Sequence, residues 1–417
     1  MKQFLSLFVF LFATYSSLLA EEKDSVRHWG MAVSVMPSEV VALDSYDKRW
    51  LNKRANGSVA VAFNHVALPS DSDAYAKDFG YPSLSIGLRY TFNGAVKMRR
   101  SEDRAWGMAQ MVDYDSHLGN TLSVYGTFTR AIYRNRKWET SYALSGGVGF
   151  NTRWYDKANN IDNELIGTPI LIYFGAGLFQ TYRFSQSWGV RAGIEFVHHS
   201  NGALYRPNKG SNTIGPSLGL VYYPYYEAQV RDRNMYKNEP FKKSLYLNIS
   251  LGIGGKTMLE DWLLTQFQTP PTAPNYRTED FKFYMAYSLQ ADLMYRYARR
   301  WASGIGMDLF YGSYASHIKA LDTAKGIEMR HSPWSLGLAG KHEVFYHNLS
   351  LAMSLGFYLH RQMGANAKEN ETPYYERIGV HYTFKSLQGL KLGINVKAHR
   401  TKADLTEIVL VYPIRIK

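Results

Sequence analysis

Alternation of apolar and polar residues along most of the chain is the feature that most limits its possible folds. Alternating segments of roughly 10 residues or more recur between turn residues, which is the length that a tilted strand needs to cross a membrane. We count about sixteen such segments, near residues 29–36, 57–66, 82–93, 120–134, 138–154, 165–183, 186–199, 212–224, 243–255, 281–297, 300–316, 329–343, 346–361, 373–385, 389–400 and 405–416. No helical period is convincing after the first 20 residues. The pattern predicts an all-β fold, an antiparallel transmembrane β-barrel.

The first 20 residues have the layout of a secretory signal peptide. Lys2 precedes an apolar run from Phe4 to Ala13, small residues follow up to Ala20, and the chain then becomes charged. We expect cleavage after Ala20. The apolar run is too short to cross a bilayer as a helix, and no later stretch approaches the roughly 20 apolar residues that a spanning helix requires. A helical membrane protein is therefore excluded, and export combined with membrane strands predicts the outer membrane as the location.

Composition narrows the chemistry further. The absence of cysteine excludes disulfides, a lipoprotein anchor, thiolate metal sites and cysteine nucleophiles. The 15% of aromatic residues, 32 of them tyrosine, is typical of the aromatic girdles of membrane barrels. A net charge of +13 is often a sign of nucleic-acid binding. The basic residues of this chain form short groups between strands rather than one helix face, which argues against nucleic acid as the partner. Anionic lipopolysaccharide headgroups are the expected counterpart; these basic groups are Lys48, Arg49, Lys53 and Arg54, then Arg99, Arg100 and Arg104, then Arg134, Arg136 and Lys137.

The connections between the predicted strands alternate in length. Short links alternate along the chain with longer ones: the short links lie at 134–137, 185–187, 298–300 and 385–387, and the longer ones at 37–56, 94–119, 200–211, 256–280 and 362–372. Outer-membrane barrels have short periplasmic turns and long outer loops. The first strand then runs outward, and the strand that ends at His199 reaches the outer leaflet. Two connections, 67–81 and 225–242, break this alternation.

The second of these exceptions marks a predicted domain boundary. Gly146–Trp154 resembles Met353–Arg361, and Trp188–Phe196 resembles Leu390–Ala398, which indicates a duplicated eight-strand unit. We therefore expect a signal peptide over 1–20, one barrel unit over 21–228, and a second, degenerate unit over 229–417. Two tandem eight-stranded barrels and one sixteen-stranded barrel both fit this pattern, and the long charged link favours two.

The predicted strand at 186–199 carries the one constellation that looks chemical. Val190, Ala192, Ile194 and Phe196 make its apolar row, so the same parity places His198 and Ser200 on the lipid side at the outer rim. His199 and Glu195 face the barrel interior. Counting back along the next strand brings Asn212 onto the lipid side as well. A serine nucleophile needs a base and a group that orients the base, which these three residues can supply for an ester held in the outer leaflet.

These residues belong to a longer stretch, roughly 115–224, that resembles the lipid A 3-O-deacylases, also called acyloxyacyl hydrolases. The resemblance runs through Leu118-Gly119-Asn120, Ile166-Gly167-Thr168, Trp188, His198-His199-Ser200-Asn201-Gly202 and Pro207-Asn208-Lys209-Gly210. It implies an outer-membrane esterase that removes an ester-linked 3-hydroxyacyl chain from lipid A of lipopolysaccharide, without a cofactor. It also implies that Ser200 is the nucleophile, that His198 is the general base, and that Asn201 or Asn208 stabilises the oxyanion.

Asn212 departs from the family pattern, since the founding members carry glutamate at this position. An amide can orient the histidine but cannot stabilise the imidazolium by charge. Asp162 or Glu164 could orient His198 instead if the 155–165 loop folds over the rim. Two other function classes therefore stay open: a barrel that binds lipopolysaccharide without chemistry, and a diffusion channel if the halves close into one wide barrel.

The sequence of the second half contains no recognisable site. Aligning Trp188 with Leu390 places Arg400 opposite His198 and Lys402 opposite Ser200, and neither can replace its counterpart. His342, Glu343 and His347 have the wrong spacing for the helical zinc motif, and no helix is expected after the glycines at 252, 254 and 255 to form a phosphate loop. We expect one site per chain, in the first half, and no metal.

Overall fold

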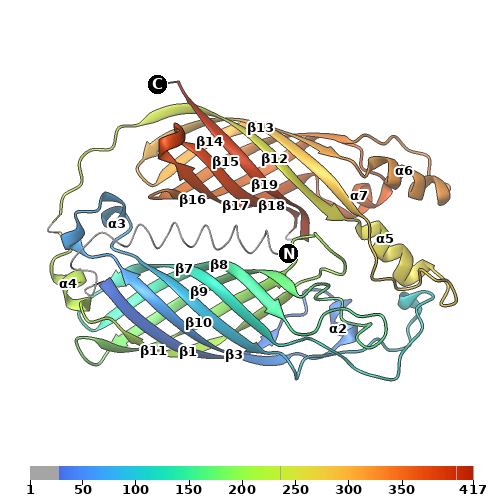
Figure 1. Cartoon of the computed structure of the whole chain (residues 1–417), viewed down its shortest axis with the longest axis horizontal. Helices are drawn as coiled ribbons and strands as arrows, with labels where there is room; N and C mark the ends of the chain where they lie inside the picture. The colour runs from blue at the N-terminus through green and yellow to red at the C-terminus, as the bar shows by residue number, and fades with distance from the viewer. Residues whose placement is uncertain (1–27, 235, 401, 417) are drawn as a thin grey trace.

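The computed structural model describes residues 28–234, 236–400 and 402–416, so the predicted signal peptide lies outside it. Within these ranges, sixteen antiparallel strands close into two separate barrels of eight (Figure 1). The alternative of one wide sixteen-stranded barrel is therefore wrong. The N-terminal barrel closes where β1 pairs with β11, and the C-terminal barrel closes where β12 pairs with β19.

The predicted strands correspond one for one to the barrel strands, with ends that differ by a few residues. The N-terminal barrel contains β1 (Trp29–Val40), β3 (Ala55–Val66), β4 (Ser83–Phe92), β7 (Thr121–Arg134), β8 (Trp138–Asn151), β9 (Ile170–Arg183), β10 (Trp188–Ser200) and β11 (Ser211–Tyr222). The C-terminal barrel contains β12 (Ser244–Thr257), β13 (Phe283–Ala298), β14 (Trp301–Gly312), β15 (Trp334–Tyr346), β16 (Leu349–Arg361), β17 (Tyr374–Phe384), β18 (Leu390–His399) and β19 (Lys402–Arg415).

The connections contain structure that alternation did not predict. The described outer loops of the N-terminal barrel form a small sheet of β2 (Leu51–Lys53), β5 (Lys97–Met98) and β6 (Ser116–His117). The expectation of no helix was wrong, because short helices of four to ten residues lie in the connections, where too few turns exist for a period to stand out. They are α2 (Asp47–Trp50), α3 (Ala74–Asp78), α4 (Tyr226–Arg231), α5 (Leu259–Leu263), α6 (Ala315–Ala324) and α7 (Ala365–Asn370), with single turns at 69–71, 104–106, 264–268 and 385–387.

Side chains alternate between a packed interior and an apolar outer face, as the period of two requires. In β10, Val190 and Ile194 are exposed on the outer face, and Leu218 and Leu220 of β11 lie beside them. An outward apolar face of this kind suits the hydrocarbon of a membrane. No helix in the described ranges is long and apolar enough to cross a membrane.

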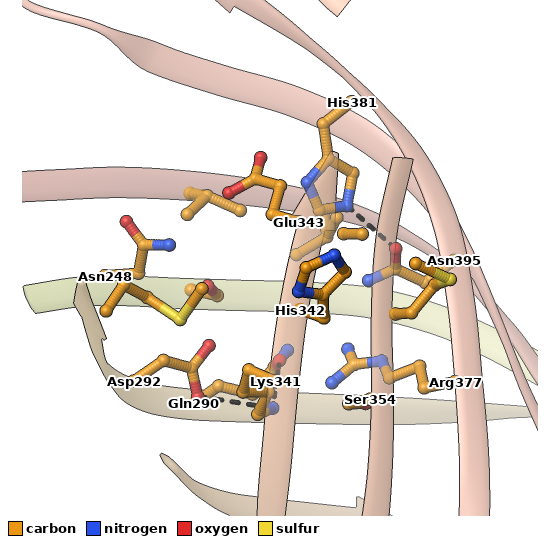
Figure 2. A pocket seen from close by; sticks show the side chains of 16 residues that line it. Asn248, Gln290, Asp292, Lys341, His342, Glu343, Ser354, Arg377, His381 and Asn395 are labelled. Carbon is orange, nitrogen blue, oxygen red and sulfur yellow. Dashed lines mark hydrogen bonds and ion pairs between the residues drawn. The ribbon is translucent and has the colours of Figure 1, made fainter. Parts of the chain in front are cut away.

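Ion pairs and hydrogen bonds fill the interior of the C-terminal barrel. Lys341 reaches Asp308 at 2.5 Å, and Lys391 pairs with Glu343 at 2.6 Å. A cavity whose lining includes Lys341, Glu343 and Asp292 has a volume of about 50 Å³ (Figure 2). A single water needs roughly 10–15 Å³ of such space, so this cavity holds a few waters and gives no support to the idea of a diffusion channel.

Candidate functional site

The outer ends of β10 and β11 bring three of the predicted site residues together. His198 lies directly opposite Asn212 in the ladder, and Ser200 follows two residues along the same face. The Nδ1 atom of His198 lies 2.8 Å from Asn212 Oδ1, and its Nε2 atom lies 2.8 Å from Ser200 Oγ. Ser200 and Asn212 are buried and His198 is half-buried. The spatial arrangement predicted from alternation is therefore present.

The tautomer of His198 follows from these two contacts. Asn212 Oδ1 can only accept a hydrogen bond, so His198 Nδ1 carries the proton and donates it. Nε2 is then left as the acceptor for the hydroxyl of Ser200. This is the protonation state in which a histidine can take a proton from a serine.

The loop at 201–210 connects the two strands and folds back over the site. Asn208 Oδ1 accepts a hydrogen bond of 2.8 Å from the backbone N–H of Asn201. Gly202 and Gly210 have φ angles of +64° and +77°, which favour glycine. A Cβ atom at Gly210 would lie 2.8 Å from Cε1 of His198, so glycine here also allows the loop to approach the imidazole.

Asn201 and Asn208 therefore differ in what they can donate. The Asn201 backbone N–H donates to Asn208 Oδ1, and the side-chain Nδ2 of Asn201 donates to the carbonyl of Pro207 at 3.5 Å. Because the Oδ1 of Asn208 is fixed as an acceptor, its Nδ2 points elsewhere. Among the described residues, the Nδ2 atom of Asn208 has no hydrogen-bond partner. Asn208 is thus the side chain of the pair with a free donor.

Asp162 and Glu164 are engaged away from His198. Asp162 accepts 2.6 Å from Arg277 and 2.9 Å from the backbone N–H of Arg100. Glu164 pairs with the Arg100 guanidinium and accepts 2.6 Å from the hydroxyl of Tyr46. Burial, reinforced by the negative charge of Glu164, holds the pKa of Tyr46 well above its ordinary value. Neither acid is free to orient the histidine in this arrangement.

His199 and Glu195 lie inside the barrel, as predicted. His199 Nε2 is 2.9 Å from Ser123 Oγ, and its ring packs edge-on to Tyr173 at 5.3 Å. Glu195 pairs with Arg89. Each therefore has a partner in the interior of the barrel, on the opposite face from Ser200.

Sequence reasoning missed the residues of the C-terminal barrel that touch the 201–210 loop. Thr406 of β19 donates 2.5 Å to the carbonyl of Gly202, and the backbone N–H of Thr257 donates 3.0 Å to the carbonyl of Ala203. Arg206 of the loop was also missed. These are ordinary threonines and an arginine in unremarkable surroundings, so no local pattern could have identified them.

One group in the C-terminal barrel has residue types that can bind a metal, namely Glu371, His399 and Asp404. Lysines and an arginine already neutralise its carboxylates: Asp404 pairs with Lys256 and Lys397, and Glu371 with Arg361. The group is therefore better described as an ion-pair network than as a metal site.

Comparison with known families points to the same region. Residues 84–221 match the family model described as lipid A 3-O-deacylase (PagL), and residues 244–416 match the model described as the C-terminal domain of acyloxyacyl hydrolase. No curated protein matches the sequence.

Comparison with solved structures gives distant matches. The outer membrane enzyme PagL is 13% identical with a TM-score of 0.27, over 46% of this chain and 97% of that one. The Pseudomonas aeruginosa protein OccD3 is 9% identical with a TM-score of 0.21, over 94% of this chain and 91% of that one. Likenesses this distant have no bearing on the chemistry of the site.

Proposed function

The chain belongs to the lipid A 3-O-deacylase family of outer-membrane enzymes, and from that premise we propose that it removes an ester-linked 3-hydroxyacyl chain from lipid A by serine catalysis. The observation that carries this proposal is the chain of hydrogen bonds from Asn212 through His198 to Ser200, at 2.8 Å each. It has the connectivity of a nucleophile, a base and an orienting group.

In the first step, Ser200 Oγ attacks the carbonyl carbon of the ester while its proton passes to His198 Nε2. Asn212 Oδ1 holds the Nδ1–H of His198 and so keeps Nε2 directed at the serine. The tetrahedral intermediate carries a negative charge on the former carbonyl oxygen. Asn208 Nδ2 is the donor available to that oxyanion, because its Oδ1 is occupied by the backbone of Asn201.

Collapse of the intermediate breaks the bond to the glucosamine oxygen, which takes the proton from His198 and leaves as an alcohol. A water molecule then attacks the acyl group on Ser200, with His198 again taking a proton. This second collapse releases a 3-hydroxy fatty acid and returns the proton to Ser200. The cycle consumes one water and uses no cofactor.

The position of the site fits a substrate that is itself a membrane lipid. Ser200 and His198 lie at the outer ends of strands, on the face that continues into the apolar residues of β10. Lipid A presents its ester bonds close to the boundary between headgroup and acyl chains. Exposed lysines of the outer loop at 41–54, such as Lys48 and Lys53, are placed to attract its phosphates.

Mass spectrometry of lipid A from cells with and without the protein tests the proposal. We expect a lipid A species lighter by one 3-hydroxyacyl group when the wild-type protein is present, and no such species with Ser200→Ala. An identical lipid A profile in cells that express well-folded wild-type protein would refute the proposed reaction.

Binding of lipopolysaccharide without chemistry is the second candidate, and the amide at Asn212 favours it because no charged group stabilises the imidazolium. Retained binding of lipid A together with no release of free 3-hydroxy fatty acid would identify this function. Fatty acid release by the purified protein would exclude it.

A further inference from the structure

We propose that the C-terminal barrel is a positioning element of the active site, whose strand ends and first outer connection hold the 201–210 loop in its working geometry. This inference rests on the proposed function, because it assigns a task to residues that act through Asn208 and Ser200. It also assigns a role to the C-terminal barrel, in which we expect no site of its own.

Direct hydrogen bonds tie the first turn of the loop to the second barrel. Thr406 Oγ1 donates 2.5 Å to the carbonyl of Gly202, next but one to Ser200. The backbone N–H of Thr257, at the end of β12, donates 3.0 Å to the carbonyl of Ala203. Any Cβ at Gly202 would collide with Thr406 Oγ1. The backbone of the loop therefore lies in close contact with β19.

Arg206 extends from the middle of the loop into the same neighbour. Its Nε and Nη2 atoms each donate 3.3 Å to the carbonyl of Thr257, and its side chain is buried. Burial lowers the pKa of Arg206, and the two acids that act to raise it, Glu260 and Asp404, belong to the C-terminal barrel. The hydrogen-bond acceptor of this buried guanidinium and the acids that partly offset its burial all come from the C-terminal barrel, so its position requires the two barrels to stay docked.

A second set of contacts supports the far end of the loop. Arg277, from the β12–β13 connection, is fully buried and donates 2.8 Å to the carbonyl of Ile161 and 2.6 Å to Asp162. The segment that follows Asp162 then supports the loop through its backbone. Glu164 O accepts from the N–H of Lys209 at 3.2 Å, and Leu165 O accepts from the N–H of Gly210 at 3.0 Å.

Both ends of the loop are thus anchored, one directly and one through the 161–165 segment. Asn208 lies between these anchors, and its amide must sit within hydrogen-bond reach of the oxyanion to stabilise it. Displacement of a catalytic group by about 1 Å from a distant change can cost about 10²-fold in rate. The C-terminal barrel is therefore expected to affect kcat more than KM.

Kinetics of Arg206→Ala, Arg206→Lys and Thr406→Val test the proposal on the full-length protein in vesicles that contain lipopolysaccharide. We expect Arg206→Ala to lower kcat by about 10²-fold and Thr406→Val by about three- to tenfold, with KM changed less than twofold. Arg206→Lys should recover part of the loss, because it keeps the charge. Thr372→Val is the matched control, since its Oγ1 bonds to a carbonyl within the C-terminal barrel, and it should keep wild-type kcat.

A spin label on Leu204→Cys provides a readout that does not depend on activity. The chain contains no cysteine, so the label reports on the loop alone, and Leu204 is 38% exposed. We expect a restricted spectrum in the wild-type background and a mobile one with Arg206→Ala and Thr406→Val combined. An unchanged spectrum, or wild-type kcat in the double variant, would overturn the inference. If the wild-type protein releases no fatty acid but the double variant still gives the mobile spectrum, the proposed function is refuted and the contact between loop and C-terminal barrel stands.

Discussion

The two barrels have the same number and direction of strands, but they differ at the turn between their last two strands. In the N-terminal barrel, residues 201–210 separate β10 from β11, whereas residues 400 and 401 separate β18 from β19. The longer connection carries Asn208 and passes close to His198. In the shorter one, β18 ends at His399, which pairs with Lys402 at the start of β19. The sequence alignment that placed Arg400 opposite His198 and Lys402 opposite Ser200 is therefore wrong, because Arg400 lies in the turn and Lys402 on the next strand.

The barrel architecture alone therefore does not account for the constellation of Ser200, His198 and Asn212. Both barrels present an apolar face to lipid and pack an interior with ion pairs such as Arg89 with Glu195 and Lys391 with Glu343. The proposed site lies at a rim where a strand pair and a loop meet, as is usual for sites carried on rigid folds. The second barrel keeps the scaffold and contributes contacts to its neighbour instead.

The largest expected effect separates the two rims directly. Ser200→Ala should lower deacylation by at least about 10³-fold, because removal of a nucleophile that works with a base removes their joint contribution. Lys402→Ala, at the start of β19 in the C-terminal barrel, should leave the rate unchanged. Release of 3-hydroxy fatty acid from lipopolysaccharide by the purified variants measures both. Equal losses in the two variants would show that the asymmetry is not one of catalysis.

Asn212 should show the next largest effect. Asn212→Ala removes the acceptor that orients His198, and we expect a loss of about 10²-fold, less than the 10⁴-fold seen when a triad acid is changed to an amide. Asn212→Glu should raise turnover by less than about tenfold, since a carboxylate also stabilises the imidazolium. Steady-state kinetics of both variants measure this. Wild-type activity in Asn212→Ala would remove this residue from the mechanism.

Asp162 and Glu164 provide the contrast to Asn212. They are paired with Arg277 and Arg100. Alanine at either position should therefore lower the free energy of unfolding by about 3–5 kcal/mol, the cost of a broken buried pair. Their effect on kcat should come through the loop and should be accompanied by this loss of stability. Abolished activity with unchanged stability would instead assign one of them to His198.

The charge of the outer loops should affect substrate capture more weakly. Replacing Lys48, Arg49, Lys53 and Arg54 with glutamine should raise KM by about three- to tenfold at low salt and by less at high salt, because screening shortens the reach of exposed charges. Lys237→Gln with Lys242→Gln, in the link between the barrels, is the matched control and should have no effect. A KM that is unchanged at low ionic strength would place phosphate recognition elsewhere.

The smallest expected effect concerns the other end of the contact between the barrels. His347 lies 2.8 Å from Asp73, which precedes α3. Burial alone would raise the pKa of Asp73, but the hydrogen bond and charge of His347 lower it overall. A lowered pKa contributes stability above the ordinary value of 3.8, and this is lost as the pH falls through the folded value. Asp73→Asn should therefore cost less than about 1 kcal/mol at pH 7 and less still at pH 3, as measured by denaturant unfolding.

Much of the site could be predicted because strand geometry has a period of two. Once Val190, Ala192, Ile194 and Phe196 are assigned to lipid, His198 and Ser200 must share their face and His199 must face inward. The same count on β11 places Asn212 opposite His198. The charged link over 225–242 favoured two barrels, and the closure of β1 on β11 and of β12 on β19 confirms two.

The rest depends on contacts that local sequence does not encode. Which strand closes a barrel is set by pairing between residues far apart, so one wide barrel could not be excluded. The short helix α6 begins at Ala315, where alternation extended the strand to 316, because three turns in an outer loop give too weak a period. Thr406 and Gly202, whose hydrogen bond joins the two barrels, are 204 residues apart in the sequence.

Covalent labelling tests whether Ser200 is the activated nucleophile of the chain. A lipid-like fluorophosphonate reacts with a serine only when a neighbouring base activates it. After digestion and peptide mass spectrometry, we predict one adduct per chain, located on Ser200, with deacylation lost in proportion to the modified fraction. Full modification of Ser200 with deacylation retained, or loss of activity with the adduct on another residue, would show that Ser200 is not the nucleophile.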